Sequence, residues 1–236
     1  MANSTLQTDV AIIGGGGAGV PAAIEVARAG GKAIVLEGAA ECGGTAAISG
    51  GGCCIVGTPL QKSQGVEDTP DMAFEDWVKW GGGQADEVWA RYYLEHTLHD
   101  LYHWAESCGV KWVDMKVQEG NRVLRWHRPD NNGLGLMTAL IKAAEKIPTI
   151  TIMTSVCPVV MGFDLTPNTL NLRSMGRWVT GYLEPPAPFT PADIDTPSIR
   201  LNGSVPVDLM GPIQVGDHDG DGIPDIALKF DRAALE

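Results

Sequence analysis

Residues 9–19 read DVAIIGGGGAG, a short apolar run that passes directly into a glycine-rich turn. An apolar run of this length is typical of a strand buried in a parallel sheet. The next segment, residues 20–30, carries apolar residues at helical spacing. The stretch therefore predicts a strand, a tight turn and a helix, which together begin an α/β nucleotide-binding fold of the Rossmann type.

The turn fits the GxGxxG pattern at Gly14, Gly16 and Gly19. The first glycine permits the tight turn, the second lets a pyrophosphate approach the backbone, and the third allows the helix to pack closely on the strand. Amide groups at the start of the helix then face the phosphates. The residues expected to bind the cofactor here are Gly14, Gly16, Gly17, Ala18 and Gly19. The alternative is a glycine-rich turn of some other α/β fold.

A second apolar strand, KAIVLE at residues 32–37, ends in Glu37. This acid lies 18 residues after Gly19, close to the offset of about 20 at which a carboxylate binds a ribose hydroxyl. Strand, helix and acid together predict dinucleotide binding. NAD and FAD both use this arrangement, so these residues leave the choice between them open.

The following stretch, GAAECGGTAAISGGG at residues 38–52, resembles the fumarate reductase and succinate dehydrogenase flavoprotein family, including its ketosteroid dehydrogenase-like members. The resemblance rests on a "GG-T/N-S/A" loop and on the "SGGG" after it. It implies FAD as the cofactor, with the loop wrapped around the pyrophosphate. The cofactor-binding residues that it implies are Gly43, Gly44, Thr45, Ser49, Gly50 and Gly51, and a flexible linker is the alternative.

Helices are expected across residues 71–112, where the resemblance continues to a W-x-x-x-x-G-V step. His96, His99 and His103 would share one face of a regular helix. Such a face is either a metal site or a partly solvated surface, and no second set of metal ligands accompanies it.

The segment HRPDNNG at residues 127–133 resembles the substrate-side loop of the fumarate reductases. The resemblance implies that His127 contacts the substrate as a catalytic residue and that Arg128 lies near the flavin. A histidine there can donate a hydrogen bond to a carboxylate or carbonyl and polarise it for hydride addition. The alternative is a loop histidine that bonds to nearby backbone. A helix from about residue 132 and a strand at residues 149–155 are predicted next.

A compositional step near residue 160 predicts two domains, an FAD-binding domain at 1–160 and a β-sandwich-like module at 161–236. Up to Val160 the chain holds 22 of its 30 glycines and all five cysteines, whereas nine of its 15 prolines follow. The family resemblance covers about Asp9 to Val156. We therefore expect the FAD-binding domain to be incomplete, without the capping domain and the late glycine–aspartate segment that the resemblance implies. Gly216-Asp217 is a poor candidate for that late segment.

Residues 161–236 show the short strands and proline turns of an all-β domain. TLNLR at 169–173 and WVTGYL at 178–183 predict a hairpin, and residues 198–207 and 226–230 also read as strands. The segment resembles modules found in exported bacterial and archaeal proteins.

Within this module, DHDGDGIPD at residues 217–225 spaces its acids as in a DxDxDGxxD loop. Hard carboxylate oxygens at such spacing suit Ca²⁺. An EF-hand would need a glutamate where Leu228 stands, so a shorter calcium loop is expected. The predicted metal ligands are Asp217, Asp219, Asp221 and Asp225. The alternative is an acidic surface turn without metal.

The formal net charge of -12 argues against binding to nucleic acid or an anionic membrane. No apolar run approaches the ~20 residues that span a bilayer. Five cysteines without a recognisable signal peptide predict reduced thiols and a cytoplasmic location. The adjacent Cys53 and Cys54 are expected to be small buried hydrophobes rather than a redox pair.

Two functions follow from these patterns. The first is an FAD-dependent oxidoreductase that transfers a hydride between flavin and a small-molecule substrate, an unsaturated acid or ketone. The second is a catalytically incomplete nucleotide fold joined to a calcium-binding attachment or interaction module.

Overall fold

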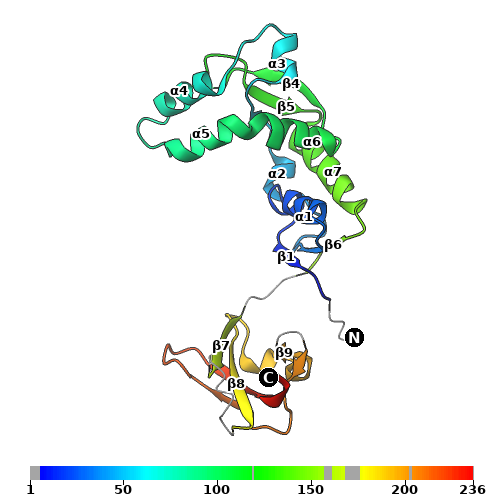
Figure 1. Cartoon of the computed structure of the whole chain (residues 1–236), viewed down its shortest axis with the longest axis vertical. Coiled ribbons are helices and arrows are strands. Elements are labelled where there is room, and N and C mark those ends of the chain that lie inside the picture. Colours follow the sequence, from blue (N-terminus) through cyan, green and yellow to red (C-terminus); the bar gives the residue numbers. More distant parts are fainter. Residues whose placement is uncertain (1–5, 119, 157–160, 168–175, 202–203, 236) are drawn as a thin grey trace. The chain divides into compact units, whose positions relative to one another are not determined.

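The computed structural model describes residues 6–118, 120–156, 161–167, 176–201 and 204–235. The chain divides into two compact units (Figure 1), one of Leu6–Cys157 and the other containing Pro158–Glu236. Among the described residues, no helix is both long and apolar enough to cross a membrane.

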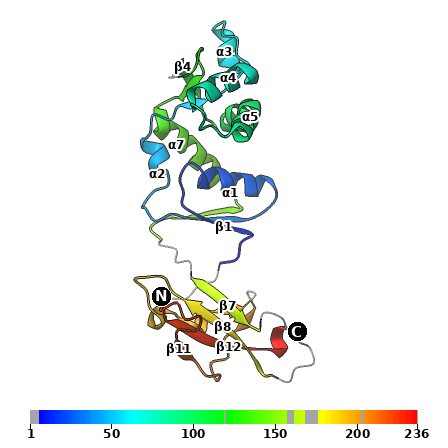
Figure 2. The same ribbon diagram turned by 90° about the vertical axis from the view of Figure 1, so that its left-hand side faces the viewer.

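The first unit contains a parallel sheet of β1 (Val10–Ile13), β2 (Ala33–Leu36) and β6 (Ile150–Met153), in the order β1-β2-β6. The helix α1 (Gly19–Arg28) connects β1 to β2. α1 packs on the sheet and on α7 (Asn132–Glu145), as Figure 2 shows. The apolar run and the helical spacing at the start of the sequence therefore form the predicted strand, turn and helix.

The buried face of α1 explains why this unit holds together. Val20, Ala23 and Ile24 are each at most 1% exposed. Ala23 packs with Val35 of the sheet, while Val20 and Ile24 pack with α7 residues such as Leu140. Burying each of the larger side chains contributes about 1.5–3 kcal/mol, so the glycine turn that precedes α1 is held by a well-packed helix.

A second, antiparallel sheet of the same unit consists of β3 (Cys53–Cys54), β5 (Trp126–Pro129) and β4 (Trp112–Lys116), in that order. Helices surround it, and α4 and α5 pack against each other (Figure 1). Their bounds, with those of the other helices of the unit, are α2 (Gly44–Ile48), α3 (Pro59–Ser63), α4 (Pro70–Trp80), α5 (Glu87–His96) and α6 (Trp104–Ser107).

A π-helical segment, Thr97–His103, joins α5 to α6 and changes the predicted histidine face. A π-helical turn contains more residues than an α-helical turn, so the regular α-helix assumed for the i, i+3, i+7 spacing is interrupted, while the rings of His99 and His103 lie with centroids 5.9 Å apart. The Nδ1 atom of His96 lies 2.6 Å from the carbonyl oxygen of Tyr92, and that of His103 lies 3.1 Å from Glu106. The three histidines are exposed or half-buried, as expected for the partly solvated surface that was the alternative to a metal site.

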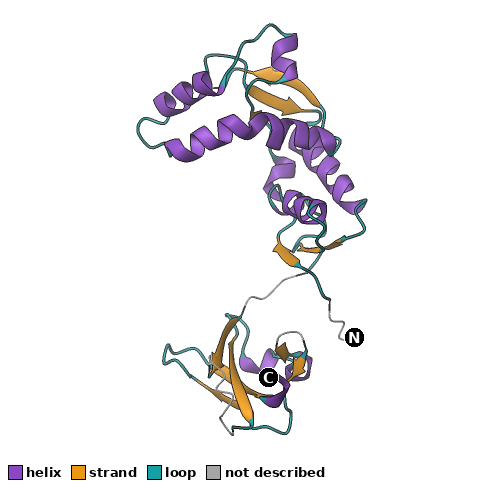
Figure 3. Cartoon of the chain, viewed as in Figure 1, coloured by secondary structure: helices purple, strands orange, loops and turns teal. Residues whose placement is uncertain are grey.

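The described part of the second unit is built mainly from antiparallel strands, with a few short 3₁₀ helices (Figure 3). Its four-stranded sheet has the order β11-β12-β8-β7, and β9 and β10 form a separate pair. The strands are β7 (Gly162–Thr166), β8 (Trp178–Glu184), β9 (Arg200–Leu201), β10 (Val205–Pro206), β11 (Gln214–Gly216) and β12 (Asp225–Asp231).

One face of the four-stranded sheet carries the core of this unit. Leu183, Leu228 and Phe230 pack there with Val205 of β10 and with Val207, which follows this strand. The predicted strand at 178–183 is present as β8, whereas its predicted partner at 169–173 lies outside the described residues. The described part of the unit has one larger sheet and one two-stranded pair, so the sandwich stays a prediction.

Candidate functional site

Two glycine-rich segments meet beside the amino end of α1. Gly14, with φ of 95°, has the left-handed backbone that glycine adopts freely. A Cβ atom on Gly19 would lie 1.8 Å from the carbonyl oxygen of Gly14. These two positions therefore require glycine, for the tight turn and for the close approach of helix to strand respectively.

The second segment, at the start of α2, contacts this turn through its backbone. The amide of Gly43 donates a 2.9 Å hydrogen bond to the carbonyl oxygen of Gly15. A Cβ atom on Gly44 would lie 3.5 Å from the Cα atom of Gly16. A Cβ atom on Gly17 would lie 3.0 Å from the Cβ atom of Ala46. Any added side chain would narrow the space between the two segments.

Several of these residues face solvent while their neighbours anchor them. Gly15 and Gly43 are buried. The exposed ones are Gly17, Ala18, Gly44 and Thr45. Ala18 precedes α1 and makes no side-chain cap to it, so the amino end of the helix is left for an external acceptor. The arrangement fits a pyrophosphate, which needs exposed backbone amides on a rigid support.

Glu37 lies where β2 ends and accepts two backbone hydrogen bonds. The amide of Ala39 donates to Oε1 at 2.8 Å and that of Gly15 to Oε2 at 2.7 Å. These two bonds, the one from Ala39 foremost, lower the pKa of the Glu37 carboxyl. An ionised carboxylate has about four acceptor positions, so two such bonds leave capacity for the hydroxyls of a ribose.

The Ser49–Gly51 loop is fixed against the amino end of α7. The hydroxyl of Ser49 donates to the carbonyl oxygen of Ala46 at 2.8 Å and accepts from the amide of Gly51 at 3.0 Å. The amide of Gly133 donates to the carbonyl oxygen of Ser49. Gly51 has φ of 64°, and a Cβ there would lie 2.5 Å from the Gly133 nitrogen. Ser49 and Gly50 stay exposed, and the short helix α2 replaces part of the expected loop.

His127 is fully buried in β5 rather than placed in a loop. Its Nε2 atom lies 2.7 Å from the hydroxyl oxygen of Thr58, and its Nδ1 atom lies 2.8 Å from the carbonyl oxygen of Arg125. Burial, before any other cause, lowers the pKa of the imidazole. The predicted loop position is wrong, and the hydrogen bond to nearby backbone that was the alternative is present.

A buried ion pair beside His127 was not predicted from the sequence. The Arg125 guanidinium donates to both carboxylate oxygens of Asp68, at 2.7 and 2.8 Å, and to Asp76 at 3.0 Å. The side chains of Arg125 and Asp68 are completely buried. Arg128, on the same strand, donates to Asp114 at 2.9 Å, and its Nε is buried without a hydrogen-bond partner in the described part of the chain.

In the second unit, the acidic loop after β11 gathers carboxylates into two overlapping groups. Ligand atoms of Asp217, Asp219 and Asp225 lie within 4.8 Å of one another, and so do those of Glu184, Asp219 and Asp221. The sequence predicted the four aspartates but not Glu184. This residue comes from β8, which pairs with β12, so only the pairing of strands brings it to the loop.

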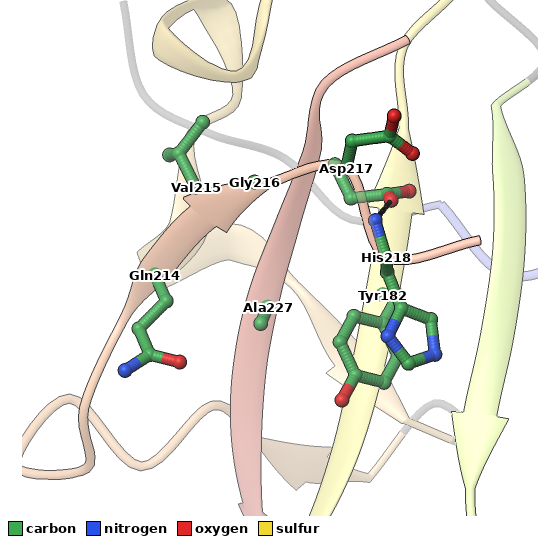
Figure 4. A pocket seen from close by; sticks show the side chains of 8 residues that line it. Tyr182, Gln214, Val215, Gly216, Asp217, His218 and Ala227 are labelled. Atoms are coloured by element: carbon green, nitrogen blue, oxygen red, sulfur yellow. Dashed lines mark hydrogen bonds between the residues drawn. The ribbon is translucent and has the colours of Figure 1, made fainter. Parts of the chain in front are cut away.

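Backbone amides inside the loop hold these carboxylates in place. Asp217 accepts from the amides of Gly220 and Gly222, and Asp225 accepts from that of His218. The His218 ring stacks on Tyr182, with centroids 3.5 Å apart, beside a cavity of about 480 Å³ (Figure 4). Burial and then the aspartates, Asp221 first, raise the pKa of Glu184, which indicates crowded negative charge.

Residues 9–157 match the family model described as "FAD binding domain". The chain belongs to this family. The match includes both glycine-rich segments, Glu37 and His127. This match favours FAD over NAD as the dinucleotide for the two glycine-rich segments around Gly15 and Gly43. The α/β fold class predicted for this part of the chain is confirmed.

Curated relatives of this flavoprotein domain are reductases and dehydrogenases. A probable fumarate reductase, Ifc3, of Shewanella frigidimarina is 36% identical over 142 residues, which are 59% of this chain and 24% of the relative. The acrylate reductase flavoprotein subunit of Shewanella woodyi is 32% identical over 143 residues, 60% of this chain and 28% of the relative. The chain thus spans about a quarter of the length of these proteins.

Solved structures show the same fold. The open conformation of a flavocytochrome c3 fumarate reductase superposes with a TM-score of 0.59 and 30% identity, over 74% of this chain and 30% of that one. A 3-ketosteroid-Δ4-(5α)-dehydrogenase from Rhodococcus jostii RHA1 gives a TM-score of 0.56 and 26% identity, over 74% of this chain and 41% of that one.

Proposed function

We propose that the chain binds FAD and serves hydride transfer between the flavin and a small unsaturated acid or ketone. The observation that carries the proposal is the contact between the Gly14–Gly19 turn and the Gly43–Thr45 segment, joined by the Gly43–Gly15 hydrogen bond. Both present exposed backbone toward the amino end of α1, as a pyrophosphate requires.

The residues proposed to hold FAD follow from this placement. Glu37 would accept from the ribose hydroxyls, and the two glycine-rich segments would donate amides to the phosphates. Ser49, Gly50 and Gly51, fixed on α7, would support the part of the cofactor beyond the pyrophosphate. Bound flavin supplies the group that accepts or donates the hydride. The chain's own residues bind and orient it.

The substrate class comes from the relatives. Their names specify fumarate, acrylate and urocanate reductases and KsdD-like steroid dehydrogenases. Fumarate and acrylate are unsaturated acids, and hydride addition to their double bonds is the reaction we propose here. The alternative, a catalytically incomplete fold with an attachment role, has no support from these enzymes. A cytoplasmic location stays a prediction from cysteine content.

We also propose that the second unit binds Ca²⁺ through Asp217, Asp219, Asp221 and Asp225. The proximity of their carboxylates, and of Glu184, supports this, because close like charges are relieved by a cation. FAD binding would then belong to the proposed domain 1–160 and Ca²⁺ binding to the proposed domain 161–236.

The test of flavin binding is the visible absorption spectrum of the purified full chain, before and after incubation with excess FAD and removal of unbound cofactor. A yellow protein with stoichiometric flavin is expected. A protein that stays colourless after reconstitution would overturn the proposal. Where flavin is retained, reoxidation of the dithionite-reduced protein by fumarate, acrylate or an α,β-unsaturated 3-ketosteroid then identifies the substrate class.

A further inference from the structure

The two ring nitrogens of His127 are both engaged inside the protein. Nδ1 lies 2.8 Å from the carbonyl oxygen of Arg125, and Nε2 lies 2.7 Å from the hydroxyl oxygen of Thr58. A carbonyl oxygen can only accept a hydrogen bond. Nδ1 must therefore carry a proton, and in a neutral imidazole the remaining nitrogen, Nε2, is then an acceptor.

We propose that Thr58 is a positioning residue whose hydroxyl donates to Nε2 and, with the Arg125 carbonyl, fixes His127 as the neutral Nδ1–H tautomer. The neutral form agrees with the complete burial of the ring and with its lowered pKa. The rings of Tyr102 and Trp112 lie nearly perpendicular to the imidazole at centroid distances of 5.8 and 6.3 Å, so the His127 ring is also held in orientation.

The direction of the Thr58 hydrogen bond is set by a longer chain of contacts. Thr58 Oγ1 accepts from the amide of Gln61 at 3.1 Å, which leaves its own proton for His127. The Gln61 side-chain amide is fixed in turn, because its Nε2 faces two acceptors, Asp68 at 2.9 Å and the carbonyl oxygen of Leu124 at 2.8 Å. Asp68 is held by Arg125. The Thr58 hydroxyl has a second acceptor in reach, Gln61 Oε1 at 3.5 Å, but the 2.7 Å contact with His127 Nε2 is much the shorter.

This tautomer has a consequence that rests on the proposed function. An Nε2 atom that accepts cannot donate to a carboxylate or a ketone oxygen. The group that could displace Thr58 from it is an O–H or N–H donor. In the proposed flavoprotein, His127 therefore supports the site through β5 and does not polarise an unsaturated acid or ketone, and that donor is another residue.

The experiment is a long-range ¹H–¹⁵N correlation spectrum of the full chain near neutral pH without FAD, with the His127 ring assigned through its backbone. The native chain is expected to show one neutral tautomer, protonated at Nδ1. Thr58→Val should remove the donor to Nε2 and shift that ¹⁵N resonance, whereas Thr58→Ser should restore the native value. Thr69→Val is the control, because the Thr69 side chain also caps its helix, α4, and among the described residues its hydrogen bond is to the amide of Met72 rather than to a histidine.

A protonated Nε2 in the native chain would overturn the proposal, and so would an unchanged Nε2 resonance in folded Thr58→Val. Should Thr58→Val fail to fold, the native spectrum and that of Thr58→Ser still decide the tautomer. Because the spectrum is recorded without FAD, failure of flavin binding leaves this result intact. Conversely, an Nε2–H tautomer would overturn the inference without touching the flavin proposal.

Discussion

The amide of Gly43 donates a 2.9 Å hydrogen bond to the carbonyl oxygen of Gly15. This bond joins two glycine-rich segments that are separated by a helix and a strand in the sequence. Each segment alone is a weak indication of a phosphate site. Their contact places both beside the amino end of α1, where backbone amides and the helix dipole favour an anion.

The first prediction uses Gly16, which faces this space. A Cβ there would come no closer than 4.0 Å to any neighbouring atom of the protein, so Gly16→Ala should fold normally. The added methyl would occupy the path of the pyrophosphate, and we expect FAD affinity to fall at least tenfold, about 1.4 kcal/mol. Flavin fluorescence titration measures this loss. Gly216→Ala, equally unhindered, is the control, and equal affinities in both variants would contradict the prediction.

The second prediction concerns the buried pair Arg125–Asp68. Asp68→Asn removes the carboxylate that accepts two hydrogen bonds from the buried Arg125 guanidinium and leaves Asp76 as its remaining acidic partner. Breaking a buried pair costs about 3–5 kcal/mol, and a loss toward the lower end is expected because Asp76 remains. Urea unfolding should show this loss in the free energy of unfolding. Asp71→Asn removes the partner of Arg91 in a pair whose acid is 84% exposed, and only a small change is expected there. Comparable losses of unfolding free energy in Asp68→Asn and Asp71→Asn would contradict the prediction that the buried pair contributes more than the exposed one.

The third prediction is acid sensitivity through Asp76. Burial alone would raise the pKa of this carboxyl, but hydrogen bonds from Arg122 and Arg125 outweigh burial and the pKa is lowered. A lowered folded pKa stabilises the fold fully above the unfolded pKa, about 3.9, and the contribution is lost as the pH falls through the folded value. Asp76→Asn should therefore flatten the fall in unfolding free energy below about pH 4, measured by urea unfolding at several pH values. An equally steep fall of the unfolding free energy with pH in Asp76→Asn and in the native chain would refute the prediction.

The sequence predicts the local geometry of the strand, glycine-rich turn and helix well and the distant contacts poorly. Gly14, Gly19 and Glu37 follow from short patterns, because a tight turn and a strand end impose their own residue types. Arg125 gives no such signal. Its partners lie 57 and 49 residues earlier in the chain, and a charged residue is normally expected at the surface.

His127 shows a different limit. Its resemblance to a substrate-contacting histidine depends on the residues that flank it in the sequence. Its exposure to solvent depends instead on the side chains that pack around it in the fold. Tyr102, which packs against the His127 ring, lies in the π-helical segment. The sequence patterns that predict α-helices do not predict such a segment. Residues 127–129 of the expected loop belong to strand β5, because β3 and β4 pair with this strand on both edges.

The fourth prediction concerns Glu184, which strand pairing adds to the acidic loop. With a chelator present, Glu184→Gln should raise the melting temperature, because it removes a charge from a crowded group of carboxylates. With excess Ca²⁺, the same variant should gain less than the native chain, since a lost ligand weakens binding and stabilisation follows ligand concentration relative to Kd. The substitution would thus raise the melting temperature without calcium but reduce the increase that calcium causes. This combination is expected of a calcium ligand and not of a residue outside the site. Asp219→Asn, which belongs to both carboxylate groups, should lose most of the calcium shift, and Asp231→Asn is the control from the same unit. A Glu184→Gln chain with the full native calcium shift would exclude Glu184 from the site, and a native chain without any shift would exclude the site itself.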